Sequence, residues 1–167
     1  TLTLGLKSVS VYSMYTLLFG MVSTLISTIT GSVQFILGQT FKANKEKYEK
    51  LLDVYEACSM ALVFSLYCIA NLFILPFMRL YTSGISDIHY IDHSLPYLFI
   101  LVYLLNNGCE SSNLSIKFAG HFKQTVSRTV FESVINLSVS ILCVLRFGIH
   151  GVLMGTIVAL LYRANDM

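Results

Sequence analysis

The stretch ESSNLSIKFAGHFKQTVSRTVFESVIN, residues 110–136, predicts two apolar helices joined by a short basic loop over residues 117–128. Glu110 lies just before that loop and Glu132 just after it, each within an apolar run. Burying an isolated charge is costly, so a carboxylate in such a run either has a compensating partner or does functional work. The surrounding sequence bears on both possibilities.

The composition is that of a membrane protein. Of 167 residues, 55% are hydrophobic and only 12% are charged, and the mean hydropathy is +0.71. Soluble domains carry about 25% charged residues, so half that share with long uncharged runs predicts membrane spans. The net charge of +2 is small and gives no indication of a nucleic-acid partner.

The pattern predicts an all-α, multi-span transmembrane helix bundle with about five membrane helices. The expected spans are residues 8–40, 57–78, 95–116, 126–145 and 152–162. The first has no charge between Lys7 and Lys42 and would be about 50 Å long, so it must tilt, bend or project from a ~30 Å hydrocarbon core. Residues 41–56 predict an amphipathic helix at the interface that runs into the second span.

Basic residues favour one side of the predicted membrane. Five spans alternate the connections between two sides, and eight of the eleven Lys and Arg residues fall on one of them. That side carries Lys42, Lys45, Lys47, Lys50, Lys117, Lys123, Arg128 and Arg163, and the other carries Lys7, Arg79 and Arg146. The positive-inside rule therefore predicts that the first set faces the cytoplasm.

A polar stripe runs along the first span. Ser23, Ser27, Thr30 and Gln34 are spaced by four, three and four, so they share one helix face. One interpretation is helix–helix packing through small polar residues, and the other is the wall of a polar cavity. Gln34 favours the cavity, because an amide at membrane depth needs a partner or water.

Polar residues also gather in the third and fourth spans. Asn106 and Glu110 share one face, and Arg128, Glu132 and Asn136 follow each other at intervals of four. Glu132 is either a pathway residue or the i, i+4 partner of Arg128.

Gly151 and Gly155 in the fifth span predict close packing on a neighbouring helix.

Catalytic and metal-binding patterns are weak. Asp87, His89, Asp92 and His93 lie in an expected polar loop over residues 80–94 and lack a metal-site motif. No cofactor is indicated. The cysteines, which are Cys58, Cys68, Cys109 and Cys143, fall in apolar segments and are expected to pack as small hydrophobes. Polar residues at membrane depth instead favour a transport pathway.

Five stretches together resemble a known family, the bacterial polysaccharide flippases. These are the O-antigen and capsule repeat-unit translocases of the multidrug/oligosaccharidyl-lipid/polysaccharide exporter superfamily. The stretches are Gly5–Ser13, Leu75–Ile91, Ala119–Thr125, Glu132–Asn136 and Phe147–Thr156.

The resemblance implies a fold, a substrate and a location. The family has two lobes of about six helices and moves an undecaprenyl-pyrophosphate-linked oligosaccharide across the bilayer by alternating access. This chain would be most of the second lobe, a fragment whose partners are the lipid bilayer and a missing N-terminal lobe. The expected location is the bacterial inner or plasma membrane, and neither an enzyme activity nor nucleic-acid binding is implied.

The architecture that the resemblance implies suggests roles for the polar residues. The stripe Ser23, Ser27, Thr30 and Gln34 would line the pathway together with Asn106, Glu110, Glu132 and Asn136. Lys117, His121 and Lys123 would attract the lipid pyrophosphate, and Glu132 would couple transport to proton or cation entry.

Two alternatives stay open. One is a multidrug or cation-coupled exporter of the same superfamily. The other is a membrane-embedded polysaccharide polymerase or acyltransferase, for which residues 87–93 are the only candidate reactive set.

Overall fold

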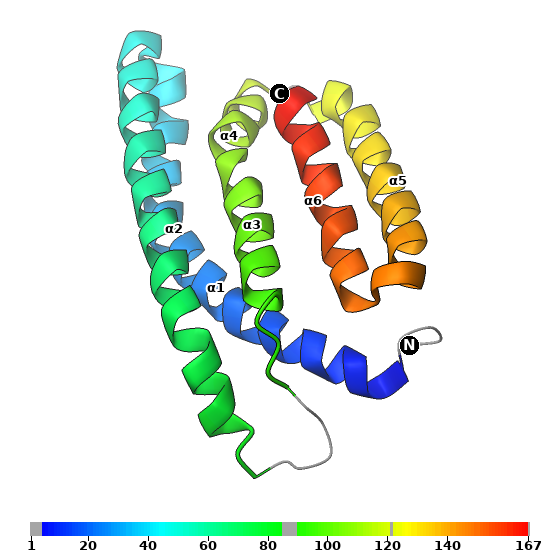
Figure 1. Ribbon diagram of the computed structural model, residues 1–167. Coiled ribbons are helices and arrows are strands. Elements are labelled where there is room, and N and C mark those ends of the chain that lie inside the picture. The colour runs from blue at the N-terminus through cyan, green and yellow to red at the C-terminus, as the bar shows by residue number, and fades with distance from the viewer. Residues whose placement is uncertain (1–4, 85–89, 121, 167) are drawn as a thin grey trace.

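The computed structural model describes residues 5–84, 90–120 and 122–166, with the side chains of 122–124 and 166 excepted. Within these ranges the chain is helical and holds no strand, which confirms the predicted all-α class (Figure 1). The helices are α1 (Gly5–Ala43), α2 (Lys45–Tyr81), α3 (Leu95–Gly108), α4 (Glu110–Ala119), α5 (Phe122–Phe147) and α6 (Ile149–Asp166).

Helices α1 and α2 form a long antiparallel hairpin. Asn44 reverses the chain, and its side-chain oxygen accepts a hydrogen bond from Lys47 N at 3.0 Å, which caps α2. Helix α1 bends along its length, one of the three outcomes expected of so long a span (Figure 1). Residues 45–56 are the first turns of α2, which runs without a break from Lys45 to Tyr81, so the predicted continuation into the second span is confirmed.

The predicted third span, residues 95–116, is broken at Cys109. That residue has φ −91° and ψ 1° and separates α3 from α4. The expected basic loop over residues 117–128 is wrong in extent. Helix α4 continues to Ala119, Gly120 ends it at φ 75°, and α5 begins at Phe122. A glycine at this position permits the left-handed conformation at little cost.

Helices α5 and α6 form a tight hairpin. The expected fourth and fifth spans left residues 146–151 between them, but only Gly148, at φ 59°, lies outside the two helices. The predicted close packing of Gly151 and Gly155 is confirmed. A Cβ added to Gly151 would lie 2.6 Å from Val144 N, and one added to Gly155 would lie 2.7 Å from Ser140 N. The absence of side chains at these two glycines is therefore what lets the two backbones touch.

Aromatic rings hold α1, α2 and α3 together. Tyr15, Phe19 and Tyr67 are completely buried, and Phe99 is nearly so. Phe19 stacks on Phe99 with ring centroids 5.4 Å apart, and Tyr67 stacks on Tyr103 at 5.3 Å. Offset ring pairs at this range add to the stabilisation from burial alone.

A second, smaller core lies where α1 meets α2 and α4. It consists of Leu37, Tyr48, Tyr55 and Leu114. The first turns of α2 carry many charges, but their apolar face packs against α1 and α4. These turns continue the same helix that forms the rest of the hairpin.

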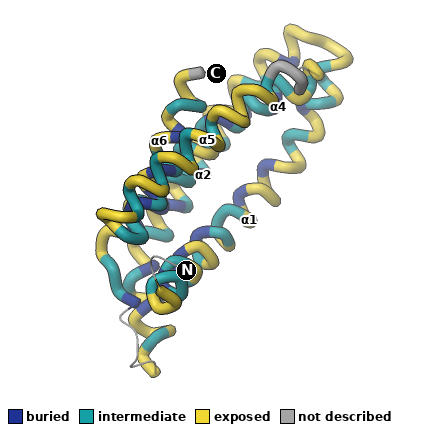
Figure 2. The backbone as a smooth tube through the Cα atoms, turned by 90° about the vertical axis from the view of Figure 1, so that its right-hand side faces the viewer, coloured by how far each residue is buried: buried dark blue, intermediate teal, exposed yellow. Residues whose placement is uncertain are grey.

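Much of the apolar surface is exposed. Large side chains such as Phe35, Leu72, Leu137 and Leu142 are more than half exposed, and exposed residues follow the outer sides of the helices (Figure 2). Soluble monomers rarely expose apolar patches of this extent. Among the residues that the structure describes, three helices are long and apolar enough to cross a membrane: α1, α2 and residues Thr125–Phe147 of α5. The five-span, six-helix-lobe architecture stays a prediction.

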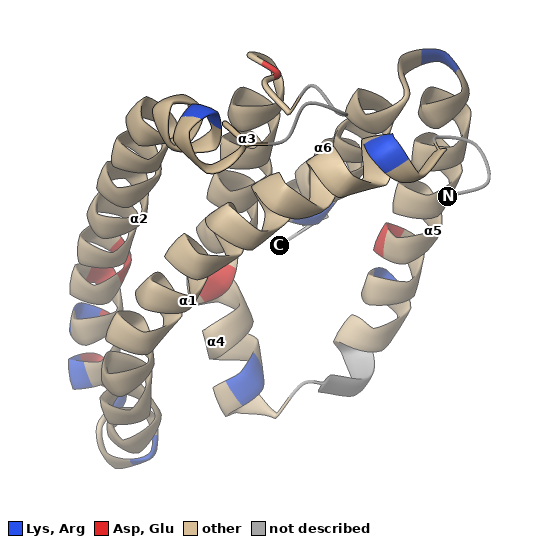
Figure 3. Ribbon diagram, turned by 90° about the horizontal axis from the view of Figure 1, so that it is seen from below, with Lys and Arg blue, Asp and Glu red and all other residues tan. Residues whose placement is uncertain are grey.

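The helix ends gather at two opposite ends of the molecule (Figure 1). The α1–α2 turn, the end of α4 and the end of α6 lie at one, here named the basic end. The start of α1, residues 90–94 and the turn between α5 and α6 lie at the other, here named the Gly148 end after the residue of that turn. This grouping matches the alternation on which the charge count rests. Most of α1 carries no charge between the two ends (Figure 3).

Candidate functional site

Arg163 joins three helices at the basic end. It lies in the last turn of α6, and its Nη1 is 3.4 Å from Glu132 Oε1 on α5. Its Nη2 donates a hydrogen bond to Asn106 Oδ1 on α3 at 2.6 Å. The Arg163 and Glu132 side chains are only 21% and 19% exposed. Asn106, Glu132 and Arg163 are here named the basic-end cluster.

The α5–α6 hairpin explains why Glu132 and Arg163 meet. Glu132 precedes Gly148 by nearly the same stretch of helix by which Arg163 follows it, so a tight antiparallel hairpin places them at the same level. Gly151 and Gly155 bring the two backbones together. A cation in the last turn of a helix also complements the helix dipole.

The ion pair with Arg163 offsets the free energy of removing the Glu132 carboxylate from water. Removing two charges from water is expensive, and a close opposite charge is what makes burial tolerable. The structure gives Glu132 an ion pair with Arg163, a partner on another helix that the i, i+4 pairing with Arg128 did not anticipate. Arg163 Nε is buried and has no hydrogen-bond partner in the described part of the chain, so the guanidinium keeps an unused donor.

The predicted pyrophosphate residues are only partly described. Lys117 Nζ lies 3.9 Å from Glu110 Oε1, and both side chains are substantially exposed, at 54% and 38%. His121 lies outside the described residues, as does the side chain of Lys123. The structure therefore places Glu110 beside Lys117 on α4, and the joint role of the three basic residues stays a prediction.

The polar stripe of α1 reaches α2 through Gln34. Gln34 Nε2 donates to Tyr55 Oη at 2.9 Å, which provides the partner that an amide at membrane depth needs. Thr30 is buried and donates to Ile26 O at 3.0 Å. Ser27 is exposed and donates to Thr24 O at 2.9 Å. Gln34 therefore contacts α2, the Thr30 and Ser27 hydroxyls bond within α1, and the pathway role of the stripe stays a prediction.

Ser23 lies near a buried hydroxyl. The Tyr67 side chain is completely buried, and its hydroxyl has no hydrogen-bond partner among the described residues. Ser23 and Asn107 lie close to that hydroxyl without hydrogen-bonding geometry. Asn107 Nδ2 instead donates to Tyr103 O at 2.7 Å. Ser23 therefore lies where α1 meets α2 and α3.

Asn136 belongs to the α5–α6 contact. Its Oδ1 accepts a hydrogen bond from Ser140 Oγ at 3.0 Å, and the same hydroxyl lies 3.4 Å from Val152 O. Of the eight predicted pathway residues, the structure brings only Asn106 and Glu132 together through Arg163, with Asn136 one turn away on α5.

A second polar cluster lies at the Gly148 end and consists of Asp92, Ser94 and His150. His150 Nε2 is 3.2 Å from Asp92 Oδ2 and 3.0 Å from Ser94 Oγ. Ser94 donates to Asp92 Oδ1 through its hydroxyl at 2.7 Å and its backbone N–H at 2.9 Å. Burial raises the pKa of Asp92, but these hydrogen bonds and the attraction of His150 outweigh burial, so its pKa lies below the ordinary value.

This arrangement differs from a catalytic triad. In a triad the carboxylate holds one ring nitrogen of the histidine while the serine contacts the other. Here Asp92 and Ser94 both contact Nε2, and the serine hydroxyl donates to the carboxylate. The cluster therefore fixes the start of α3 to the start of α6. Asp87 and His89, from the loop considered for metal binding and for the enzyme alternative, lie outside the described residues.

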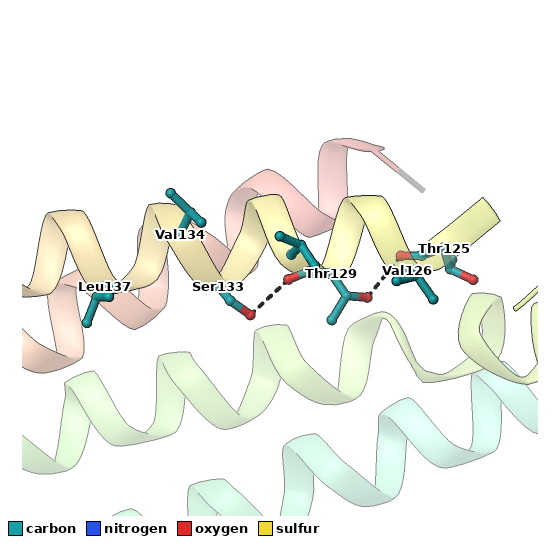
Figure 4. Close-up of a pocket in the computed structure, with 7 residues that line it drawn as sticks. Thr125, Val126, Thr129, Ser133, Val134 and Leu137 are labelled. Atoms are coloured by element: carbon teal, nitrogen blue, oxygen red, sulfur yellow. Dashed lines mark hydrogen bonds between the residues drawn. The ribbon is translucent and has the colours of Figure 1, made fainter. Parts of the chain in front are cut away.

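A hollow of ≈ 500 Å³ follows one side of α5. Its lining includes three hydroxyl residues at intervals of four, Thr125, Thr129 and Ser133 (Figure 4). Thr129 donates to Thr125 O at 3.1 Å and Ser133 to Thr129 O at 2.8 Å, so both hydroxyls are satisfied by their own helix. In Figure 4 Thr129 and Ser133 lie on one side of α5 and Val134 on the other.

Two residues of these clusters were missed from the sequence, Arg163 and His150. A signal for Arg163 was present: the fourth and fifth spans are joined by a short turn, and their charged residues lie at similar distances from it. His150 carried no comparable signal, because its partner Asp92 precedes it by three helices. Within the described part of the chain, no group of three or more His, Cys, Asp or Glu side chains could hold a metal ion.

No protein-family model, curated protein or solved structure matches this chain.

Proposed function

We propose that this chain is part of a membrane translocase that moves lipid-linked oligosaccharide repeat units for surface polysaccharide synthesis in bacteria. The sequence resemblance to the polysaccharide flippases supports the substrate class. The three long apolar helices and the exposed apolar surface support a place in the bilayer. In this proposal the basic end faces the cytoplasm of the inner membrane, and alternating access requires a further lobe.

The basic-end cluster is the observation that carries the proposal. Ionisable residues on membrane helices are costly and commonly mark a transport pathway. Glu132 and Arg163 occupy two apolar helices, and Asn106 adds a third. Entry of a proton or cation at Glu132 would release Arg163, and that exchange is a simple means of coupling an ion to movement between helices.

The substrate would approach from the same end. Lys117, with His121 and Lys123, would attract the pyrophosphate. Sugar hydroxyls would replace water along Ser23, Ser27, Thr30, Gln34, Glu110 and Asn136. Phosphate groups bind strongly to basic side chains, and hydroxyl-rich surfaces suit sugars.

The test uses the full-length protein in a bacterial strain that lacks it. Glu132→Gln should abolish or strongly reduce surface polysaccharide at normal membrane abundance. The neutral amide can neither form an ion pair with Arg163 nor take up a proton in its place. Glu46→Gln is the matched control, because Glu46 is 79% exposed in an ion pair with Lys50 and should leave polysaccharide unchanged. Undiminished polysaccharide in Glu132→Gln would refute the coupling role.

Two further comparisons separate substrate from coupling. A Lys117→Gln/Lys123→Gln variant should reduce translocation if the basic residues attract pyrophosphate, and unchanged translocation would refute that role. Deleting the gene should remove surface polysaccharide. A deletion strain with normal polysaccharide and increased sensitivity to toxic cations would instead indicate the drug or cation exporter.

A further inference from the structure

We propose that Asp92, Ser94 and His150 form a pH-sensitive clamp at the Gly148 end, which protonation of His150 tightens. The inference rests on the proposed function only for the assignment of this end to the outer face. The clamp itself is defined by contacts between described residues. Its role is to keep α6 against α3 on the side opposite the basic-end cluster.

Helix α6 is tied to the α3 region by polar contacts at both ends. Near its start, His150 contacts Asp92 and Ser94. In its last turn, Arg163 contacts Asn106. These two basic residues are separated by about 20 Å along the helix axis, at the usual rise per residue. Opening a path beside α6 therefore requires breaking the clamp at the Gly148 end or the Arg163–Asn106 contact at the basic end.

The segment before α3 is a firm anchor for this clamp. The Tyr15 hydroxyl on α1 is completely buried and lies 3.2 Å from Tyr90 O, Asp92 O and Asp92 N. The Tyr90 hydroxyl is 3.1 Å from Ser10 Oγ. Because α1 holds the backbone of residues 90–92, movement of α6 would separate His150 from Asp92 rather than drag the segment along.

Protonation changes the strength of the clamp in one direction. To face a carboxylate oxygen, His150 Nε2 must carry a hydrogen, so the next proton goes to Nδ1 and makes the ring a cation. Histidine side chains change charge between pH 5 and 8, whereas arginine stays charged. Acid therefore adds attraction between Asp92 and His150.

Among the described residues at this end, no carboxylate other than that of Asp92 faces His150. Asp92 is the carboxylate that faces His150. Helices α1, α2 and α5 contribute the cations Lys7, Arg79 and Arg146, and His93 is an exposed titratable side chain in the same segment as Asp92.

The test measures the α3–α6 distance directly. In the full-length protein in lipid nanodiscs, with its native cysteines replaced by serine, Tyr97→Cys and Met154→Cys carry spin labels. Both positions are exposed, on α3 and α6. Lowering the pH from 8.0 to 5.5 should raise the ratio of short-distance to long-distance populations about two- to fivefold, the range that an exposed ion pair supplies.

His150→Gln should remove this response, and His93→Gln should keep it. Asp92→Asn provides a second variant, whose amide can still accept the Ser94 hydrogen bonds, and it should also remove the response. A wild-type ratio that does not change with pH, or a full response in both Asp92→Asn and a folded His150→Gln, overturns the clamp. The readout needs no transport, so a pH-dependent distance in a protein that moves no oligosaccharide would refute the proposed function alone.

Discussion

Glu132 Oε1 and Arg163 Nη1 lie 3.4 Å apart although they belong to different helices and are distant along the chain. The turn at Gly148 and the close contact of α5 with α6 produce this pairing. Each side chain is about four-fifths buried, so each charge depends on the other for compensation.

A double-mutant cycle measures that dependence. Arg163→Gln leaves the Glu132 carboxylate without its partner and should lower the free energy of unfolding by about 2–4 kcal/mol. Glu132→Gln combined with Arg163→Gln should recover much of this loss, because no uncompensated charge is left. The measurement is thermal or denaturant unfolding in matched detergent.

The control pair for this cycle is Glu46 and Lys50. Their Oε1–Nζ distance is shorter, 2.8 Å, but their side chains are 79% and 76% exposed. The same cycle should give a coupling of no more than about 0.5 kcal/mol, since exposed i, i+4 pairs contribute little. Equal coupling in the two cycles would contradict the part assigned to burial.

Glycine-to-alanine substitutions at two helix positions should affect stability differently, because only one of these glycines lies in the α5–α6 contact. Gly155→Ala should destabilise the protein by about 1–3 kcal/mol, because the new methyl group meets the Ser140 backbone. Gly20→Ala in α1 should be neutral or stabilising, by up to about 1 kcal/mol, because nothing lies within 4 Å and alanine favours the helix. Melting temperatures of the two variants decide the matter, and a Gly155→Ala protein as stable as wild type would refute the contact.

Tyr15 predicts a local effect on residues 90–94. Tyr15→Phe keeps the buried ring and removes the contacts of its hydroxyl with Tyr90 O and with both backbone groups of Asp92. The expected cost is about 1–2 kcal/mol, with faster amide hydrogen exchange in residues 90–94. Tyr97→Phe, at a 65% exposed position, should leave that exchange unchanged.

Asp92 predicts a loss of stability in acid. Its pKa is lowered in the folded protein, so the carboxylate stabilises the fold fully above the ordinary value of about 3.9. That contribution is lost as the pH falls below about 3.9 and through the lower folded value. The melting temperatures of wild type and Asp92→Asn should therefore differ at pH 6, and the difference should shrink as the pH falls below about 3.9. A constant difference across that range would contradict the lowered pKa.

The helical class and most helix positions could be predicted because both follow from local properties. Long apolar runs located α1, α2 and α5, and the Gly151–Gly155 spacing anticipated a close contact. Helix ends were less predictable. Residues 117–128 contain several charged or ionisable side chains that suggest a loop, yet apolar packing of Leu114 and Phe118 beside α1 and α2 extends α4 to Ala119.

The partners of the polar residues were less accessible than the helices. Gln34 was expected to need a partner, but its choice of Tyr55 depends on how α1 lies against α2. Glu132 was recognised as unusual, and helical spacing pointed to Arg128 because periodicity describes neighbours on one helix only. Arg163 became the partner through packing between helices.

Composition and periodicity alone thus determined an all-helical chain with long apolar helices, because hydropathy and helical spacing are properties of single segments. Only the tertiary structure decided which charges meet: Glu132 with Arg163 at one end of α6, and Asp92 with His150 at the other. The physical reason is that the cost of a buried charge can be met by any opposite charge within reach, and reach is set by how the helices pack.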